Sequence, residues 1–371
     1  MLDALKRVGV RMFGRGDRSL AVPVFDGPYT PNNRLEEAPV FFEATGLEDM
    51  AIDAQGALIA ACGRELVRID AAGQASSLAG FDLPIQALAP CRDAGVVVAL
   101  GGRIQFEGGA GHGKRLEGFE GRPLHGVNAL HACADGRLLI SEGSMERPYD
   151  QWTRDLLEHG HSGRILEYNP ATGATRVLAA NLHYCFGLFV AGERVLFSET
   201  WAHRVGELGP DGPPTFPLDS LPGYPSRLSA ASDGGFWLSL LAGRTQLMEF
   251  ILREDDFRKE MMRTVQPHLW YAPSLLAGRN YLEAQQTAGV MQMGIMKPWA
   301  PPRSYGLVVR LDAQLQPLYS FHSRAGGRHH GVVAVQEQGD HLFALSKGSG
   351  RILRLALDSL RPNPTDEGQQ R

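Results

Sequence analysis

The feature that most constrains the fold is a phrase that recurs along the chain. Two short apolar runs are joined by a turn that contains glycine or Asp-Gly, and a second such pair often follows. The clearest copy, GRILEYNPATGATRVL at residues 163–178, alternates apolar and polar residues on both sides of its turn. A period of two predicts strands, and short glycine-containing turns join strands into hairpins. Copies of the phrase begin at Asp49, Ile85, Val127, Phe186, Ser226 and Gly331.

These repeats predict the fold class. Units of about 40–50 residues that each supply up to four strands are typical of propeller blades. A strand-rich chain without alternating strands and helices also argues against an α/β fold. We therefore expect an all-β protein, a six-bladed β-propeller over residues 22–358. A leader segment at residues 1–21 and a flexible tail at residues 359–371 would flank it.

Two segments interrupt the repeat. Within residues 145–163 of the third unit, YDQWTRDLLEHG has helical spacing and would cap the mouth of the channel. A longer insert at about residues 245–304 interrupts the fifth unit, and its segments REDDFRKEMMRTV and YLEAQQTAGVMQMGIM both predict helices. Long inserts on one face of a repeat fold usually serve as lids or interaction surfaces, so we expect a lid or a partner surface rather than a second domain.

Composition and charge exclude some functions and favour a location. The net charge is −4 without a basic stripe, which gives no footprint for a nucleic-acid partner. No apolar run has the length of a membrane span, and the N-terminus lacks the apolar core of a secretory signal. The four cysteines have no metal-finger spacing, which predicts free thiols in a reducing, cytoplasmic compartment. The oligomeric state stays open.

The leader segment combines apolar residues with Lys6, Arg7, Arg11 and Arg15. This mixture predicts a short basic amphipathic helix that touches a membrane surface, which would make the protein membrane-peripheral. The alternative is a frayed or packed leader helix without membrane contact.

Candidate site residues follow from propeller geometry, because the first residues of each innermost strand face the central channel. The residues at these positions are Glu48, Asp49, Asn128, Phe186, Ser226, Arg227 and His330. The second unit has no well-defined counterpart. The adjacent carboxylates of Glu48 and Asp49 and the amide of Asn128 are oxygen ligands suited to a hard cation. A Glu-Asp pair before a strand is also common in solvated turns.

Several blocks of the chain resemble a known family. DGPYTPNNRLEEA, GLEDMAIDAQGALI, GRILEYNPATG and LPGYPSRLSAASDGGFWLSL are similar to strictosidine-synthase-like proteins, of the six-bladed propeller superfamily that includes gluconolactonases and paraoxonases. The resemblance runs from about Val22 to Leu357. It implies that metal-dependent relatives hold an axial calcium between a Glu or Glu-Asp pair of the first blade, asparagines of the third and fourth, and an acid of the fifth.

This chain departs from that ligand set at two positions. Glu48, Asp49 and Asn128 match it, and would be the ligands if calcium were bound, but Phe186 replaces one asparagine and Ser226 with Arg227 replaces the acid. A phenyl ring cannot ligate calcium, and a guanidinium would repel it. We therefore predict no cofactor, with Arg227 in place of the metal and paired with Glu48, Asp49 or both.

The resemblance also implies that strictosidine synthase uses a sixth-blade glutamate, and the matching position here is about Val333. Condensation of that type is therefore not expected. The function predicted instead is metal-independent acid/base chemistry on a small organic molecule in the channel, of a lyase, cyclising or hydrolytic kind. The predicted catalytic residues are Glu48, Arg227 and His330, and the predicted substrate-binding residues are Asp49, Asn128, Tyr184, Phe186 and Ser226. A calcium-dependent lactonase or esterase and a non-catalytic binding or scaffold propeller stay open as alternatives.

Overall fold

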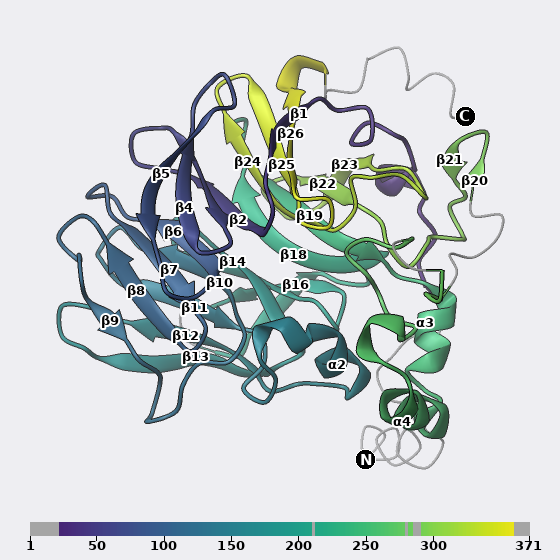
Figure 1. Ribbon diagram of the computed structural model, residues 1–371, viewed down its shortest axis with the longest axis horizontal. Helices are drawn as coiled ribbons and strands as arrows, with labels where there is room; N and C mark the ends of the chain where they lie inside the picture. The colour runs from purple at the N-terminus through teal and green to yellow at the C-terminus, as the bar shows by residue number, and fades with distance from the viewer. Residues whose placement is uncertain (1–21, 210–211, 279–280, 285–290, 360–371) are drawn as a thin grey trace.

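The computed structural model describes residues 22–209, 212–278, 281–284 and 291–359. The predicted leader at residues 1–21 and nearly all of the predicted tail lie outside these ranges. Within them, six four-stranded antiparallel sheets surround a common centre, as Figure 1 shows. The prediction of a six-bladed β-propeller is confirmed.

Each blade runs from an inner strand at the axis to an outer strand at the rim. Blade 1 comprises β2 (Leu47–Ile52), β3 (Leu58–Cys62), β4 (Glu65–Ile69) and β5 (Ala75–Gly80). Blade 2 comprises β6 (Ile85–Pro90), β7 (Val96–Leu100), β8 (Arg103–Glu107) and β9 (Arg115–Leu116). Blade 3 comprises β10 (Val127–Ala132), β11 (Leu138–Glu142), β12 (Gly163–Tyr168) and β13 (Thr175–Leu182). Blade 4 comprises β14 (Cys185–Ala191), β15 (Arg194–Glu199), β16 (Arg204–Leu208) and β17 (Thr215–Leu218).

The last two blades differ from this simple order. Blade 5 comprises β18 (Gly223–Ala230), β19 (Phe236–Gly243), β22 (Leu307–Leu311) and β23 (Pro317–His322), with the long insert between its second and third strands. Blade 6 takes β24 (Val332–Gln338), β25 (His341–Ser346) and β26 (Arg351–Ala356) from the C-terminal part, and β1 (Val40–Glu43) from the N-terminal part. The pairing of β1 with β26 closes the ring, because it joins the two ends of the chain in one sheet.

Apolar side chains fill the spaces between neighbouring blades. Between blades 1 and 2, for example, Ile59, Leu66, Ile85 and Val98 are almost fully buried against one another. Burial of such side chains stabilises the fold by roughly 1.5–3 kcal/mol each, before the entropy of ordering is counted. The repeated packing gives the axial residues a rigid frame.

A β-bulge recurs at the start of the inner strands and determines which side chains reach the axis. The pairing between inner and second strands shifts register around Glu48, Gln86, Asn128, Phe186, Arg227 and Val333. Bulges re-aim side chains and are common beside functional sites. The bulge in blade 2 puts Gln86 at the axial position that the sequence left undefined. The bulge in blade 6 puts Val333 at the corresponding position.

Two excursions project from this frame. The first, between β11 and β12, contains η2 (Tyr149–Gln151) and α2 (Trp152–Leu157), as the helical spacing predicted. The second contains α3 (Gln246–Ile251), α4 (Asp255–Thr264), η3 (Pro267–Leu269) and the hairpin of β20 (Met291–Gln292) with β21 (Ile295–Met296). The remaining short elements are η1 (Gly27–Tyr29) and η4 (Leu357–Ser359). Figure 1 shows α3 and α4 at one side of the propeller.

The helix predicted at residues 281–296 is wrong where its end is described. Met293 and Gly294 both adopt positive φ, 51° and 81°, and so connect β20 to β21. Positive φ at both central residues is what a two-residue hairpin turn needs, and it is incompatible with a continuing helix. Among the described helices, none is long and apolar enough to cross a membrane.

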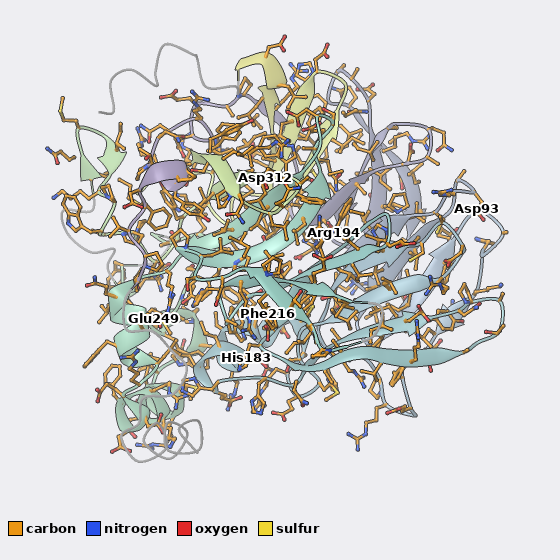
Figure 2. All side chains as sticks on the ribbon, turned by 180° about the vertical axis from the view of Figure 1, so that it is seen from behind. Asp93, His183, Arg194, Phe216, Glu249 and Asp312 are labelled. Carbon is orange, nitrogen blue, oxygen red and sulfur yellow. The ribbon has the colours of Figure 1, made fainter. Side chains whose placement is uncertain are left out.

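A buried polar cluster attaches the insert to the propeller. Glu249 of α3, labelled in Figure 2, accepts a hydrogen bond from Nε of Arg244 at 2.8 Å, and its Oε1 lies 3.5 Å from Nε2 of His203. Burial alone would raise the pKa of Glu249, but hydrogen bonds from His203 and Arg244 lower it to about 2. The insert is therefore fixed at its start by an ionised carboxylate.

Candidate functional site

The guanidinium of Arg227 lies on the axis and binds the inner strands of several blades. From β18 of blade 5 it donates hydrogen bonds to the backbone carbonyls of Glu48 at 3.3 Å, Gln86 at 3.3 Å and Asn128 at 2.6 Å. These three carbonyls belong to the bulge residues of blades 1, 2 and 3. The guanidinium also lies over the ring of Phe186 in blade 4, 5.1 Å from its centroid. One cationic side chain thus contacts four of the other blades.

The ion pair predicted for Arg227 is present with Asp49. Nε of Arg227 lies 3.2 Å from Oδ1 of Asp49, an ion-pair contact whose angle falls short of a hydrogen bond. The same carboxylate accepts hydrogen bonds from the backbone amides of Met50 at 2.9 Å and Leu88 at 3.0 Å. Burial raises the pKa of Asp49, although Arg227 and these amides act in the opposite direction. The Asp49 carboxylate therefore has a structural role, because its partners all belong to the inner strands.

Three of the predicted substrate-binding residues also serve the frame. The side chain of Asn128 donates to the carbonyl of Cys185 at 2.9 Å, which links blade 3 to blade 4. The hydroxyl of Ser226 donates to the carbonyl of Ser239 at 3.0 Å. With Asp49, these side chains hold inner strands together, and none of the three lines the groove or the aromatic cavity described below.

The donor atoms at the axis do not fit a calcium ion. Three side chains match the ligand set of metal-dependent relatives, but each already has partners within the protein. Glu48 is bound to Lys347 and Tyr149, and Asp49 is bound to Arg227 and to backbone amides. Asn128 is bound to the carbonyl of Cys185. The backbone carbonyls that point to the axis accept hydrogen bonds from a guanidinium, which carries a fixed positive charge. No cluster of three or more His, Cys, Asp or Glu side chains that would suit a metal occurs in the described ranges.

Next to this guanidinium is a second polar cluster, made by Glu48, Tyr149 and Lys347. Nζ of Lys347, in the turn after β25, lies 2.5 Å from Oε2 of Glu48 and donates to the hydroxyl of Tyr149 at 3.1 Å. The Tyr149 hydroxyl donates to Oε2 of Glu48 at 2.8 Å. The three groups come from blade 1, the blade 3 excursion and blade 6, so the fold alone brings them together.

Burial shifts the pKa values of this cluster. It lowers the pKa of Lys347, and the attraction of the Glu48 carboxylate offsets only part of that change. Burial, followed by the negative charge of Glu48, raises the pKa of Tyr149 well above its ordinary value. A buried lysine of lowered pKa beside a carboxylate and a phenol can exchange protons with a ligand.

An aromatic cavity of about 20 Å³ lies beside the cluster. Its walls are Tyr149, Trp152, Tyr184, Phe186, Trp201, Leu241, Leu275, Val333 and Lys347. Trp201 stacks between Tyr184, at a centroid distance of 4.5 Å, and Trp152, at 6.1 Å. Leu275 comes from the insert and Trp152 from α2, so both excursions cover this cavity. Its volume corresponds to about one water molecule.

A larger groove adjoins the cluster on its other side. It has a volume of about 560 Å³, and its lining comes from blades 1, 2 and 3 and from residues 148–150. Glu48 and Tyr149 form part of this lining, and Tyr149 also lines the aromatic cavity. The amide oxygen of Gln86, another lining residue, is buried without a hydrogen-bond partner in the described part of the chain. A groove of this volume is large enough for a small organic ligand.

His330 does not belong to the axial site, and the prediction that placed it there needs correction. It precedes β24, whose bulge directs Val333 rather than His330 to the axis, and Val333 lines the aromatic cavity. Nδ1 of His330 lies 2.9 Å from the hydroxyl of Ser304, and its Nε2 lies 2.8 Å from the carbonyl of Arg324. With both ring nitrogens engaged, and with a pKa that burial lowers, His330 has a structural position.

Sequence reasoning missed Lys347 and Tyr149. Lys347 follows the second strand of blade 6, and Tyr149 begins a 3-10 turn in the blade 3 excursion, so neither is at the start of an inner strand. The excursion's helical pattern beside the expected channel was the available signal for Tyr149. No pattern in the sequence marked Lys347.

The fold and this axial cluster define a class: a six-bladed β-propeller with a polar site where its inner strands meet. Comparison with known proteins is consistent with this class. A gluconolactonase of Xanthomonas campestris has a similar structure, with a TM-score of 0.55 at 14% identity over 92% of this chain and 99% of that one. That likeness concerns the fold alone.

Sequence comparison narrows the class. The strictosidine synthase family model matches residues 128–207. Adipocyte plasma membrane-associated protein of Salmo salar is 27% identical over 65% of this chain and 54% of its own length. Protein STRICTOSIDINE SYNTHASE-LIKE 6 of Arabidopsis thaliana is 25% identical over 62% of this chain and 54% of its own. These matches show that the chain is similar to the strictosidine-synthase-like family, and it spans about half the length of these relatives.

Proposed function

We propose that this protein is a metal-independent enzyme that acts on a small organic molecule by acid/base chemistry. The observation that carries the proposal is the axial position of Arg227, whose guanidinium binds three backbone carbonyls and Asp49. A fixed cation in this position supplies the positive charge that a metal would provide and opposes the binding of a divalent ion. Arg227 is then a positioning residue, and proton transfer falls to the neighbouring cluster.

The roles in this cluster follow from its contacts. The substrate would occupy the groove, where Glu48 and Tyr149 are exposed to it. Glu48 would accept or return a proton as the general base, and Lys347 would hold its carboxylate in place. Tyr149 would help to orient the Glu48 carboxylate through the hydrogen bond that its hydroxyl donates. Lyase, cyclising and hydrolytic reactions all use such a set of groups.

A substrate panel with and without calcium tests the proposal. Purified protein would be assayed on lactones and aryl esters, in the presence of calcium and then of a chelator. The proposal expects turnover that the chelator leaves unchanged and that Glu48→Gln reduces by about 10²–10⁴-fold, the usual contribution of a general base. Glu65→Gln, at an exposed carboxylate of the same blade, is the matched control and should keep full activity. Turnover that requires calcium would instead support a calcium-dependent lactonase or esterase.

A non-catalytic binding protein is the second candidate, and the contacts of the axial side chains favour it. Asp49, Asn128 and Ser226 bind neighbouring strands, and none of them lines the groove that could hold a ligand. Saturable binding of a panel compound in the groove, measured by calorimetry, without turnover of any compound would support this candidate over the enzyme.

We also propose that the protein is cytoplasmic and attaches peripherally to anionic membranes. The insert exposes several large apolar side chains, including Phe250 with 58%, Phe257 with 56% and Trp299 with 61% of their surface accessible. The described start of the chain lies next to Trp299, since the amide of Phe25 donates to the carbonyl of Pro298 at 2.9 Å. Exposed aromatic side chains near cationic residues favour a lipid interface. The membrane-associated relative from Salmo salar supports the same location.

A further inference from the structure

We infer that Lys347 is a nucleophile that forms an imine with the carbonyl group of a small aldehyde or ketone. The inference rests on the proposed function, because it names a substrate class for the same site. Lys347 is suited to this role by its place: it lines the aromatic cavity and contacts Glu48 and Tyr149, the two polar groups that also line the groove.

Lys347 differs from the other lysines whose surroundings are described. The sequence has five lysines, at positions 6, 114, 259, 297 and 347. Lys114 and Lys259 are exposed, whereas only 18% of the Lys347 side chain is accessible. Its ammonium group lies 4.6 Å from the centroid of the Tyr149 ring, so an aromatic face and a carboxylate surround it. Burial of this ammonium group removes it from water, which costs free energy. An ion pair with a purely structural role could lie at the surface and avoid that cost.

The charges that face Lys347 decide how easily it becomes a neutral amine. Glu48 and Asp49 of β2 favour the ammonium form, whereas Arg227 of β18 and burial oppose it. Tyr149 of η2 is neutral in ordinary conditions, since its pKa is raised. The net effect is a lowered pKa of Lys347, so that its neutral, nucleophilic form exists at a lower pH than in an exposed lysine.

The reaction balances with the groups present. Glu48 takes the ammonium proton, and the free amine attacks the carbonyl carbon, so that a C–N bond forms and the C=O π electrons move to oxygen. The oxygen takes the proton held by Glu48, and the second nitrogen proton then passes to Glu48. Glu48 protonates the hydroxyl group as it leaves as water, and the nitrogen lone pair forms the C=N bond, which gives the protonated imine and returns Glu48 to its carboxylate form. No oxidant, reductant or further reactant is needed.

The groove, which Glu48 and Tyr149 line beside Lys347, limits the carbonyl compound to a small, uncharged one. Most of the groove lining is apolar, including Leu83, Pro84, Pro123 and Leu124. Glu48 and Asp150 would repel an anionic substrate, and Arg227 is already occupied by backbone carbonyls. An aliphatic or aromatic aldehyde with an apolar body fits this lining best.

Reductive trapping tests the inference. Full-length protein is incubated with benzaldehyde or butanal and sodium cyanoborohydride at pH 7, and peptide mass spectrometry locates the alkylated lysines. We expect Lys347 to be labelled faster than Lys114 or Lys259, because its lowered pKa leaves more of its amine unprotonated at pH 7. Lys259→Arg, at an exposed lysine, is the matched control and should leave the labelling of Lys347 unchanged.

Two outcomes separate this inference from the proposed function. Labelling confined to exposed lysines, in protein whose circular dichroism is native, overturns the inference. Retention of calcium-independent turnover by Lys347→Arg also overturns it and leaves the proposed function standing. Selective labelling of Lys347 in a protein without turnover supports the inference and contradicts the enzyme. If Lys347→Arg does not fold, the labelling pattern of the unmodified protein still decides.

Discussion

Replacement of Arg227 by methionine should destabilise the whole propeller, because this side chain connects blade 5 to blades 1, 2 and 3. Arg227→Met leaves the Asp49 carboxylate buried without its cation and removes the donors from three buried carbonyls. Breaking a buried ion pair by removing one partner costs about 3–5 kcal/mol. Two of the three hydrogen bonds are long, at 3.3 Å, so we expect a loss near the middle of this range, about 4 kcal/mol.

The pH dependence of this loss identifies its cause. The pKa of Asp49 is already raised by burial, and removal of Arg227 takes away the charge that opposes this shift. A carboxyl group with a raised pKa in the folded state binds more protons there than in the unfolded state, so stability falls as the pH rises above the unfolded value of about 4. The deficit of Arg227→Met should therefore be larger at pH 8 than at pH 5.

Urea unfolding followed by tryptophan fluorescence measures both effects. Arg176→Met, at an exposed arginine paired with Glu167, is the control and should change the free energy of unfolding by less than about 1 kcal/mol. Asp49→Asn combined with Arg227→Met should recover about 1–3 kcal/mol, because neighbouring residues in one network are not additive. A loss below about 1 kcal/mol for Arg227→Met, independent of pH, would refute the reasoning.

Three other predictions concern the cluster, the insert and the membrane. Glu48→Gln should lower turnover by about 10²–10⁴-fold while far-ultraviolet circular dichroism stays native, and turnover equal to that of the wild type contradicts the role of general base. Glu249→Gln should lower the free energy of unfolding by up to about 3 kcal/mol at pH 7, because its pKa is held at about 2, and the difference should vanish as the pH falls from about 4 to 2; urea titrations at pH 7 and pH 3 test this. Replacement of Phe250, Phe257 and Trp299 by serine should abolish sedimentation with vesicles of phosphatidylserine and phosphatidylcholine; equal sedimentation of both proteins would show that the insert does not touch lipid.

The propeller could be predicted from sequence because each blade repeats a local pattern. The alternation in residues 163–178 and its relatives requires hairpins whatever the long-range arrangement, and their number sets the number of blades. The closure by β1 was not visible, since Val40–Glu43 is a single short strand whose partner, β26, lies more than 300 residues further on. A lone strand carries no local sign of the sheet it joins.

The site was predictable only where it follows the repeat. Glu48, Asp49 and Arg227 occupy corresponding places in different inner strands, so the ion pair of Arg227 with Asp49 could be anticipated. His330 was placed at the axis because it precedes a strand, but the bulge in β24 directs Val333 there instead. A shift of one residue in a strand exchanges its faces, and the sequence does not determine where a bulge falls.

Lys347 and Tyr149 could not be predicted for a different reason. They reach Glu48 from a turn and from an excursion, and their positions depend on how three distant segments pack. The cost of burying Lys347 is visible only once its neighbours are known. Such residues require the three-dimensional structure.

The calcium content of the dialysed protein tests the central claim most directly. Wild-type protein and Arg227→Asp would be dialysed against calcium, then against metal-free buffer, and measured by elemental analysis. The account predicts no stoichiometric calcium in the wild type, because the guanidinium of Arg227 holds the axial position, and a gain of affinity in Arg227→Asp. One tightly held calcium per wild-type chain would contradict it.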